Sequence, residues 1–159
     1  MRLSNLADYA VITMCQAALH CGSGSLVDPD QPRRGRVSAA ELAAETGLPV
    51  PTVQKLVSKL TAAGLLRSLR GAHGGLQLGR PAAAITVADI VEAIEGPITL
   101  TACVDHGPCD FEAGCSMRPH WPVINNALRG ALAGVTLAQL RYPPAPPPTN
   151  PILTQEHPA

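Results

Sequence analysis

The sequence has few aromatic residues, no long apolar run and no hydrophobic leader. Its aromatic side chains are limited to Phe111, Trp121, Tyr9 and Tyr142, so the core must be built from aliphatic residues and alanine, a composition that favours helices over a β-sandwich. No apolar stretch reaches the length of a membrane-spanning helix, and residues 1–10 lack the hydrophobic segment and cleavage site of a signal peptide. We therefore expect a mostly α-helical, cytoplasmic protein with no membrane partner.

The chain also lacks Cys-x-x-Cys pairs and recognisable cofactor-binding loops. An enzyme that uses Cys103 or Cys109 as a nucleophile or disulfide partner is therefore the disfavoured alternative, and we expect no enzymatic activity. Because disulfides are rare in the reducing cytoplasm, clustered thiols there indicate metal ligands or redox-active groups. The cysteines of the chain are Cys15, Cys21, Cys103, Cys109 and Cys115.

The formal net charge is zero, but the charges are unevenly distributed along the chain. Residues 33–80 contain eight Lys and Arg residues and two acidic ones, whereas residues 89–112 contain six acidic residues and neither Lys nor Arg. A strongly basic segment is suited to contact with phosphates. The two segments therefore have different functions, and nucleic acid is the expected partner of the first.

Two predicted helices in the basic segment have the signals of a helix-turn-helix. Ser38, with Glu41 three residues later, forms the capping-box pattern of a helix that ends at Gly47. Pro51 lies in the first turn of a second helix, which has an apolar stripe and ends at Gly64. The opposite face of the second helix carries short hydrogen-bonding residues and cations, which are suited to base edges and phosphates in a major groove. A solvated amphipathic helix is the alternative.

A basic hairpin follows these helices. Residues 65–70 and 76–80 have the pattern of two short strands around a Gly-rich turn, with arginines at the base of the hairpin. Together with a first helix at 5–19, this order of elements is that of a winged helix-turn-helix, which we expect at residues 1–82. The cations of this domain are expected to contact phosphates or the minor groove, and its short polar residues the bases. The predicted DNA-binding residues are Thr52, Gln54, Lys55, Ser58, Lys59, Arg67, Arg70 and His73.

The second half of the chain is predicted to contain a cysteine-bearing loop, an apolar helix and a tail. Residues 83–118 comprise a linking helix followed by the cysteine loop. Residues 119–141 are rich in Ala, Leu and Val, with glycines at 130 and 134, and carry few charges. Because so apolar a helix is unfavourable in water, we expect a long C-terminal dimerisation helix that packs against a second copy of the chain. Residues 142–159 are expected to be a disordered, Pro-rich tail.

Three cysteines, Cys103, Cys109 and Cys115, follow one another at equal intervals of six residues in one loop. Glycines, a proline and acidic residues flank them, which is not a core pattern, so three unrelated buried thiols are the weaker alternative. Thiolates spaced along a flexible loop are suited to an iron-sulfur cluster, but zinc takes the same ligands and both usually bind four. The spacing therefore leaves the metal and the fourth ligand open. Candidates for the fourth ligand are His106, His120, Glu112, Cys15, Cys21 and Asp8.

Several segments of the chain form one specific combination of motifs. They are MRLSNLADYAV at 1–11, RGAHGG at 70–75, ITVADIVEAIEGP at 85–97 and the three evenly spaced cysteines. This combination resembles the Rrf family of iron-sulfur winged-helix transcription regulators, the group of IscR, NsrR and RirA, as far as about residue 140. Within the family, GPITLT before the first loop cysteine, RPHW after the last one and the pair Ile124 and Asn125 look most like the branch that regulates the SUF cluster-assembly operon.

The resemblance implies a homodimeric repressor that binds a double-stranded DNA operator and senses the state of a 2Fe-2S or 4Fe-4S cluster. Each cluster would be bound by the three loop cysteines of one subunit and by a ligand near the N-terminus of the other. Asp8 stands where the nitric-oxide-sensing members carry a carboxylate ligand; otherwise it is an exposed acid near a helix N-terminus. IscR-like members place a histidine three residues after the last cysteine, where this chain has Arg118. A zinc-stabilised regulator and a nitric oxide or redox sensor of the same fold are the alternatives.

Overall fold

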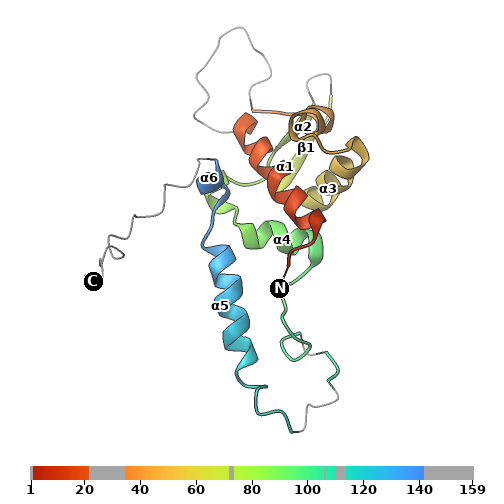
Figure 1. The fold of residues 1–159 in the computed structure, drawn as a ribbon. Coiled ribbons are helices and arrows are strands. Elements are labelled where there is room, and N and C mark those ends of the chain that lie inside the picture. Colours follow the sequence, from red (N-terminus) through yellow and green to blue (C-terminus); the bar gives the residue numbers. More distant parts are fainter. Residues whose placement is uncertain (1, 22–34, 72–73, 106, 110–113, 142–159) are drawn as a thin grey trace, which may run out of the picture.

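The computed structural model describes residues 2–21, 35–71, 74–105, 107–109 and 114–141, which form a mostly helical fold with one small sheet (Figure 1). The predicted Pro-rich tail and His73 lie outside the described residues. Within those described ranges, no helix is both long enough and apolar enough to cross a membrane. The elements in chain order are α1 (Asn5–Cys21), α2 (Ala39–Thr46), α3 (Val50–Ala62), β1 (Leu66–Leu69), β2 (Gly75–Leu78), the 3-10 helix η1 (Ala82–Ala84), α4 (Val87–Glu95), α5 (Trp121–Ala133) and α6 (Leu137–Leu140).

The predicted helix-turn-helix is confirmed as α2 and α3. The side chain of Ser38 accepts a hydrogen bond from the backbone N–H of Glu41, and the Glu41 carboxylate accepts one from the backbone N–H of Ser38. Gly47 ends α2 with a φ of 71°, a left-handed conformation that glycine adopts without a steric penalty. Pro51 occupies the first turn of α3, where its missing N–H has no cost. Local signals therefore determine both helices.

The first helix, α1, lies at the centre of the fold (Figure 1). Ala10 and Ala17 are fully buried, and their small side chains allow α2, α3, α4, α6 and β2 to pack around α1. Met14 of α1 lies in the same core cluster as Leu42 of α2 and Leu56 of α3. Among the described residues, the fully buried core is aliphatic, as the low aromatic content predicts.

The predicted hairpin is formed by β1 and β2, two antiparallel strands that place Arg67 opposite Gln77. Leu66 is buried in the core cluster while Arg67 is exposed, so the hairpin has one face on the core and one in solvent. A Cβ atom at Gly79 would lie against the backbone carbonyl of Gly64. The close approach of the hairpin to the end of α3 therefore requires glycine at this position.

The structure corrects the prediction of one long helix at residues 119–141. The segment is divided into α5 and α6, because α5 ends before Gly134 and a new N-terminus follows. The side chain of Thr136 accepts a hydrogen bond from the backbone N–H of Gln139, and the Gln139 side chain accepts one from the backbone N–H of Thr136. This second capping box starts α6 as a separate helix.

The helix α6 returns to the beginning of α4. The backbone N–H of Leu137 donates to the carbonyl of Ile85, and the N–H of Val87 donates to the carbonyl of Val135. Leu137 is fully buried in the main core cluster. These contacts hold the two ends of one segment next to each other. The segment comprises α4, the cysteine loop and α5.

The helix α5 extends away from the rest of the fold, with its C-terminal part beside α4 (Figure 1). Leu128 and Leu132 pack against a small cluster that includes Val91 of α4. In the N-terminal half of α5, by contrast, Val123 is 68% exposed and Ile124 is 41% exposed. The described chain therefore leaves an uncovered apolar surface on this half of α5.

Candidate nucleic-acid interface and metal centre

The outward face of α3 carries three of the predicted base-contacting and phosphate-contacting residues. Gln54, Lys55 and Ser58 are exposed on the side of the helix opposite its buried stripe, and Thr52 is half-buried at the edge of that face. Short polar side chains and a cation on one helical face can reach base edges and phosphates. The geometry of α3 is therefore that of a recognition helix.

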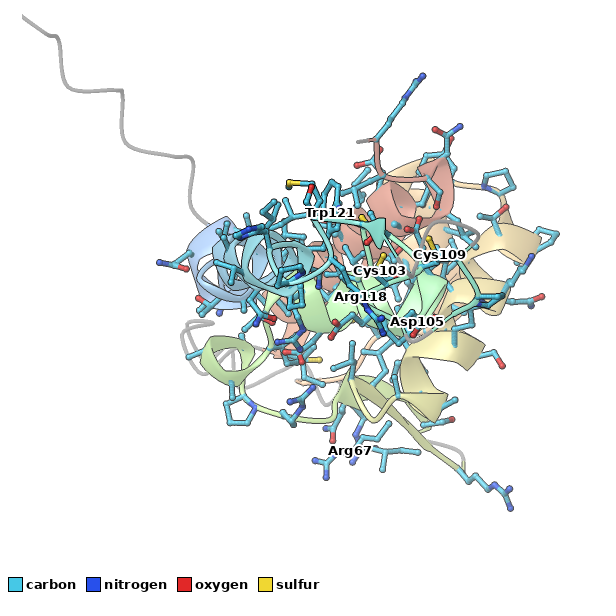
Figure 2. The ribbon with its side chains drawn as sticks, turned by 90° about the horizontal axis from the view of Figure 1, so that it is seen from below. Arg67, Cys103, Asp105, Cys109, Arg118 and Trp121 are labelled. Carbon is cyan, nitrogen blue, oxygen red and sulfur yellow. The ribbon has the colours of Figure 1, made fainter. Side chains whose placement is uncertain are left out.

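Two arginines extend the basic surface from α3 onto the hairpin. Arg67 and Arg70 are both exposed, and Nη2 of Arg67 donates to Oε1 of Gln77 at 2.8 Å, which holds its guanidinium along the strand pair. In Figure 2, Arg67 lies at the edge of the molecule and points outward, away from Cys103 and Cys109. The hairpin therefore has the charge and exposure of a DNA-contacting wing.

Lys59 has a different environment from the other predicted DNA contacts. Its side chain is half-buried, and Nζ donates to the carbonyl oxygen of Ile94 at 2.7 Å. Ile94 lies in the last turn of α4, where backbone carbonyls lack partners within the helix. The ammonium group is thus directed at α4, and sequence reasoning missed this contact because it joins residues 35 positions apart.

The backbone that enters the cysteine loop is held by one buried side chain of α5. Asn125 is 4% exposed; its Oδ1 accepts a hydrogen bond from the Leu100 N–H at 3.0 Å, and its Nδ2 donates to the Ile98 carbonyl at 2.9 Å. These bonds fix the chain immediately before Cys103. Local sequence does not distinguish Asn125 from Asn126, because both partners of Asn125 lie on a distant segment.

We expect Asn125→Leu to lower the free energy of unfolding by about 2–4 kcal/mol, because it leaves a backbone donor and a backbone acceptor unpaired in a buried place. Urea denaturation followed by circular dichroism measures the change. Asn126→Leu is the matched control, since Asn126 is the exposed neighbour on the same helix. Equal unfolding free energies for the two variants would show that the Asn125 bonds contribute nothing.

An ion pair also joins α5 to α4. Nε and Nη2 of Arg129 donate to the two carboxylate oxygens of Glu92 at 2.7 and 2.8 Å. The hydrogen-bonded guanidinium lowers the pKa of Glu92, although partial burial opposes this effect. Glu92 also accepts a hydrogen bond from the backbone N–H of Ile98 at 3.4 Å. The pair therefore stays charged at neutral pH and fixes α5 beside the entrance of the cysteine loop.

The three loop cysteines are free, half-buried thiols. Near Cys103, the Thr101 hydroxyl is buried and has no hydrogen-bond partner among the described residues. Within the described residues, however, no three Cys, His, Asp or Glu side chains converge to hold a metal ion. The donor chemistry fits a thiolate-bound metal, whereas the described part of the loop does not bring three ligands together within one chain.

The candidates for a fourth ligand lie in different surroundings. Asp8 is exposed in the first turn of α1, and His120 is exposed directly before α5. Cys15 and Cys21 are half-buried on α1, and burial raises the pKa of both thiols, which keeps them protonated at neutral pH. Accessibility to a second chain therefore favours Asp8 and His120. The remaining candidates, His106 and Glu112, lie outside the described residues.

A comparison with known protein families identifies the fold and its general function. The family model Rrf2, described as an iron-dependent transcriptional regulator, matches residues 3–142. This chain belongs to the Rrf2 family. The helix-turn-helix and hairpin are thus those of an Rrf2 transcription regulator, and the match covers the cysteine loop and α5 as well.

Individual Rrf2-type regulators are similar over most of their length. IscR of Cronobacter sakazakii is 30% identical over 140 residues, which is 88% of this chain and 80% of that protein. Among solved structures, CymR, the global cysteine regulator of B. subtilis, has a TM-score of 0.66 at 29% identity and covers 89% of this chain and 96% of its own. IscR of T. potens has a TM-score of 0.63 at 28% identity, with 88% and 85% covered.

Proposed function

We propose that this Rrf2 protein is a homodimeric repressor that binds an operator in double-stranded DNA and responds to an iron-sulfur cluster held by its cysteine loop. The observation that carries the proposal is the division of the fold into an exposed basic surface on α3 and β1 and a loop of three half-buried thiols beside α5. The motifs GPITLT before Cys103 and RPHW after Cys115, which resemble those of the branch that regulates the SUF operon, support cluster-assembly genes as the targets.

The DNA-binding step follows from the positions of the exposed side chains. Thr52, Gln54 and Ser58 would contact base edges in the major groove, while Lys55 and the wing arginines Arg67 and Arg70 contact phosphates or the minor groove. His73, which lies outside the described residues, stays a predicted DNA contact. Two such units, related by the symmetry of a dimer, are suited to two half-sites of a near-palindromic operator.

In the proposed dimer, the interface would lie on the uncovered part of α5. Val123 and Ile124 expose apolar surface there, and a second copy of α5 would remove it from water. Although α5 is shorter than the predicted helix, its uncovered half lies outside the helical part of the fold, alongside the segment that connects α4 to α5 (Figure 1), where a partner can reach it.

The cluster would be bound by Cys103, Cys109 and Cys115, as a 2Fe-2S or 4Fe-4S group, with Asp8 of the partner subunit as the fourth ligand. When bound, the cluster supplies a centre whose assembly and loss depend on iron supply and oxidants. Two observations support this proposal: the buried Thr101 hydroxyl has no hydrogen-bond partner among the described residues, and Asp8 is accessible on α1. Ligands from both subunits would make the relative position of the two recognition helices depend on the cluster.

Anaerobic purification combined with selection from a pool of randomised DNA duplexes tests the proposal. We expect a brown dimer that contains iron and acid-labile sulfide, and that enriches one near-palindromic sequence found upstream of cluster-assembly genes. A colourless protein with stoichiometric zinc would instead support the zinc-stabilised regulator. Enrichment of the same sequence by the cluster-loaded and cluster-free forms with equal affinity would contradict the cluster switch, and no enrichment would contradict operator binding.

A further inference from the structure

Lys59 lies at the junction between the recognition helix and the segment that leads into the cysteine loop. On α3, Gln54, Lys55 and Ser58 lie opposite the buried stripe, whereas Lys59 lies at its flank, because successive residues of an α-helix are rotated by about 100°. The half-buried Lys59 therefore faces a neighbouring helix. This neighbour is α4, which packs against α3.

The electrostatics at the end of α4 favour a cation at this place. The carbonyl of Ile94 is among the last four of the helix, which have no partner within the helix and form the negative end of its dipole. Nζ of Lys59 lies 2.7 Å from this carbonyl oxygen. A lysine from another helix thus occupies the position in which a cation stabilises a helix C-terminus.

The same end of α4 continues into the cysteine loop. The N–H of Gly96 donates to the carbonyl of Glu92 at 3.0 Å, and two residues later the Ile98 carbonyl accepts the bond from Asn125. Lys59 and Asn125 therefore hold the segment between α4 and the loop from its two ends. A displacement of this segment would act on α3 through Lys59.

We propose that Lys59 is a positioning residue that fixes the recognition helix to the C-terminus of α4, and that it does not contact a DNA phosphate. This inference rests on the proposed DNA-binding function and assigns a different role to one member of the predicted contact set. Lys59 orients α3 relative to the core and to the entrance of the cysteine loop. Lys55, one turn earlier and exposed, contacts the phosphate.

Two measurements on Lys59→Met and on the matched control Lys55→Met distinguish the roles. The first is the salt dependence of binding to the duplex that the wild-type chain enriches from a randomised pool. Loss of a phosphate contact lowers the slope of log K against log salt concentration by about 0.9 per contact. We expect a decrease of about 1.8 for Lys55→Met, because the proposed dimer loses two such contacts. For Lys59→Met, we expect an unchanged slope. We expect its affinity to be lower by about tenfold, which is the effect of one mismatched base pair.

The second measurement is hydrogen exchange in the DNA-free protein. We expect the hydrogen-bonded amides of Gly96, Ile98 and Leu100 to exchange about threefold to tenfold faster in Lys59→Met, because the end of α4 loses its cation, and at the wild-type rate in Lys55→Met. Lys59→Arg retains a cationic donor and should restore both the exchange rate and the affinity. Circular dichroism of each variant shows whether the fold is retained, and the restoration by arginine is meaningful even where Lys59→Met unfolds.

Two outcomes would overturn the inference. One is a salt slope that falls as much in Lys59→Met as in Lys55→Met, which would make Lys59 a phosphate contact. The other is wild-type exchange at residues 96–100 in Lys59→Met, which would show that the bond to Ile94 does not hold the segment. A wild-type chain that enriches no duplex contradicts the proposed function instead, and the exchange experiment then still decides whether Lys59 holds α4.

Discussion

Cys109→Ala, purified anaerobically, is expected to contain almost no iron and acid-labile sulfide, whereas both are expected in the wild-type protein. The substitution leaves two loop thiolates, and a cluster that depends on three thiolates and one weaker ligand has no replacement for the one removed. Iron and sulfide per chain and the visible absorption spectrum measure the effect. Circular dichroism should show a folded variant, because the half-buried Cys109 lies in the loop and outside both core clusters.

The chain offers a matched control for this experiment. Cys15 is also a half-buried free thiol, but it lies on α1 against the main core, and burial raises its pKa. Cys15→Ala should therefore retain the wild-type iron and sulfide content.

Asp8→Ala should retain part of the cluster and lose it faster in air. A full cluster in Cys109→Ala would exclude the loop as its site, and a fully stable one in Asp8→Ala would exclude that ligand.

The triple variant Lys55→Ala, Arg67→Ala, Arg70→Ala is expected to lose at least about a hundredfold in affinity for the selected duplex. The three side chains are exposed and form the cationic surface of α3 and the wing. If all six cations of a dimer contact phosphates, the slope of log K against log salt concentration decreases by up to about 5. Fluorescence anisotropy at several salt concentrations measures affinity and slope together.

Arg2→Ala is the control for a general effect of charge. Arg2 is exposed three residues before α1, and the first turn of α1 lies at the end of that helix away from the hairpin (Figure 1). The Arg2→Ala variant should leave the affinity for the duplex and the salt slope nearly unchanged. If the triple variant binds with a wild-type salt slope, the basic surface of α3 and the wing does not face DNA, and the interface must be sought elsewhere on the fold.

The winged helix-turn-helix was predictable because its signals are local. The Ser38 capping box, Pro51 in the first turn of α3 and the Gly-rich turn of the hairpin each determine structure within a few residues. The end of α5 had a local signal as well, since Thr136 and Gln139 have the capping-box spacing, but the apolar character of the segment outweighed it in the prediction.

The contacts between segments were not predictable in the same way. The Lys59 bond to Ile94 and the Asn125 bonds to Ile98 and Leu100 join distant positions, and each depends on how the helices pack. Helical periodicity places Lys59 near the polar face without showing that α4 covers its flank. The cysteine spacing likewise indicates donor types, whereas the convergence of ligands depends on the path of the loop and on a second subunit.

Two backbone hydrogen bonds join the start of α4 to the start of α6, and they determine how far changes in the cysteine loop can affect the rest of the fold. The paired backbone bonds of Val87 with Val135 and of Leu137 with Ile85 mean that the chain leaves and re-enters the DNA-binding half at one point. When the two ends of a segment are held together in this way, lengthening a flexible loop inside it lowers stability little. The loop-closure entropy costs about 0.6 kcal/mol for each doubling of the loop length. The length of the cysteine loop after Leu100 can therefore be changed at little cost in stability, provided that the bonds of Ile98 and Leu100 to Asn125, which hold the entrance of the loop, are kept.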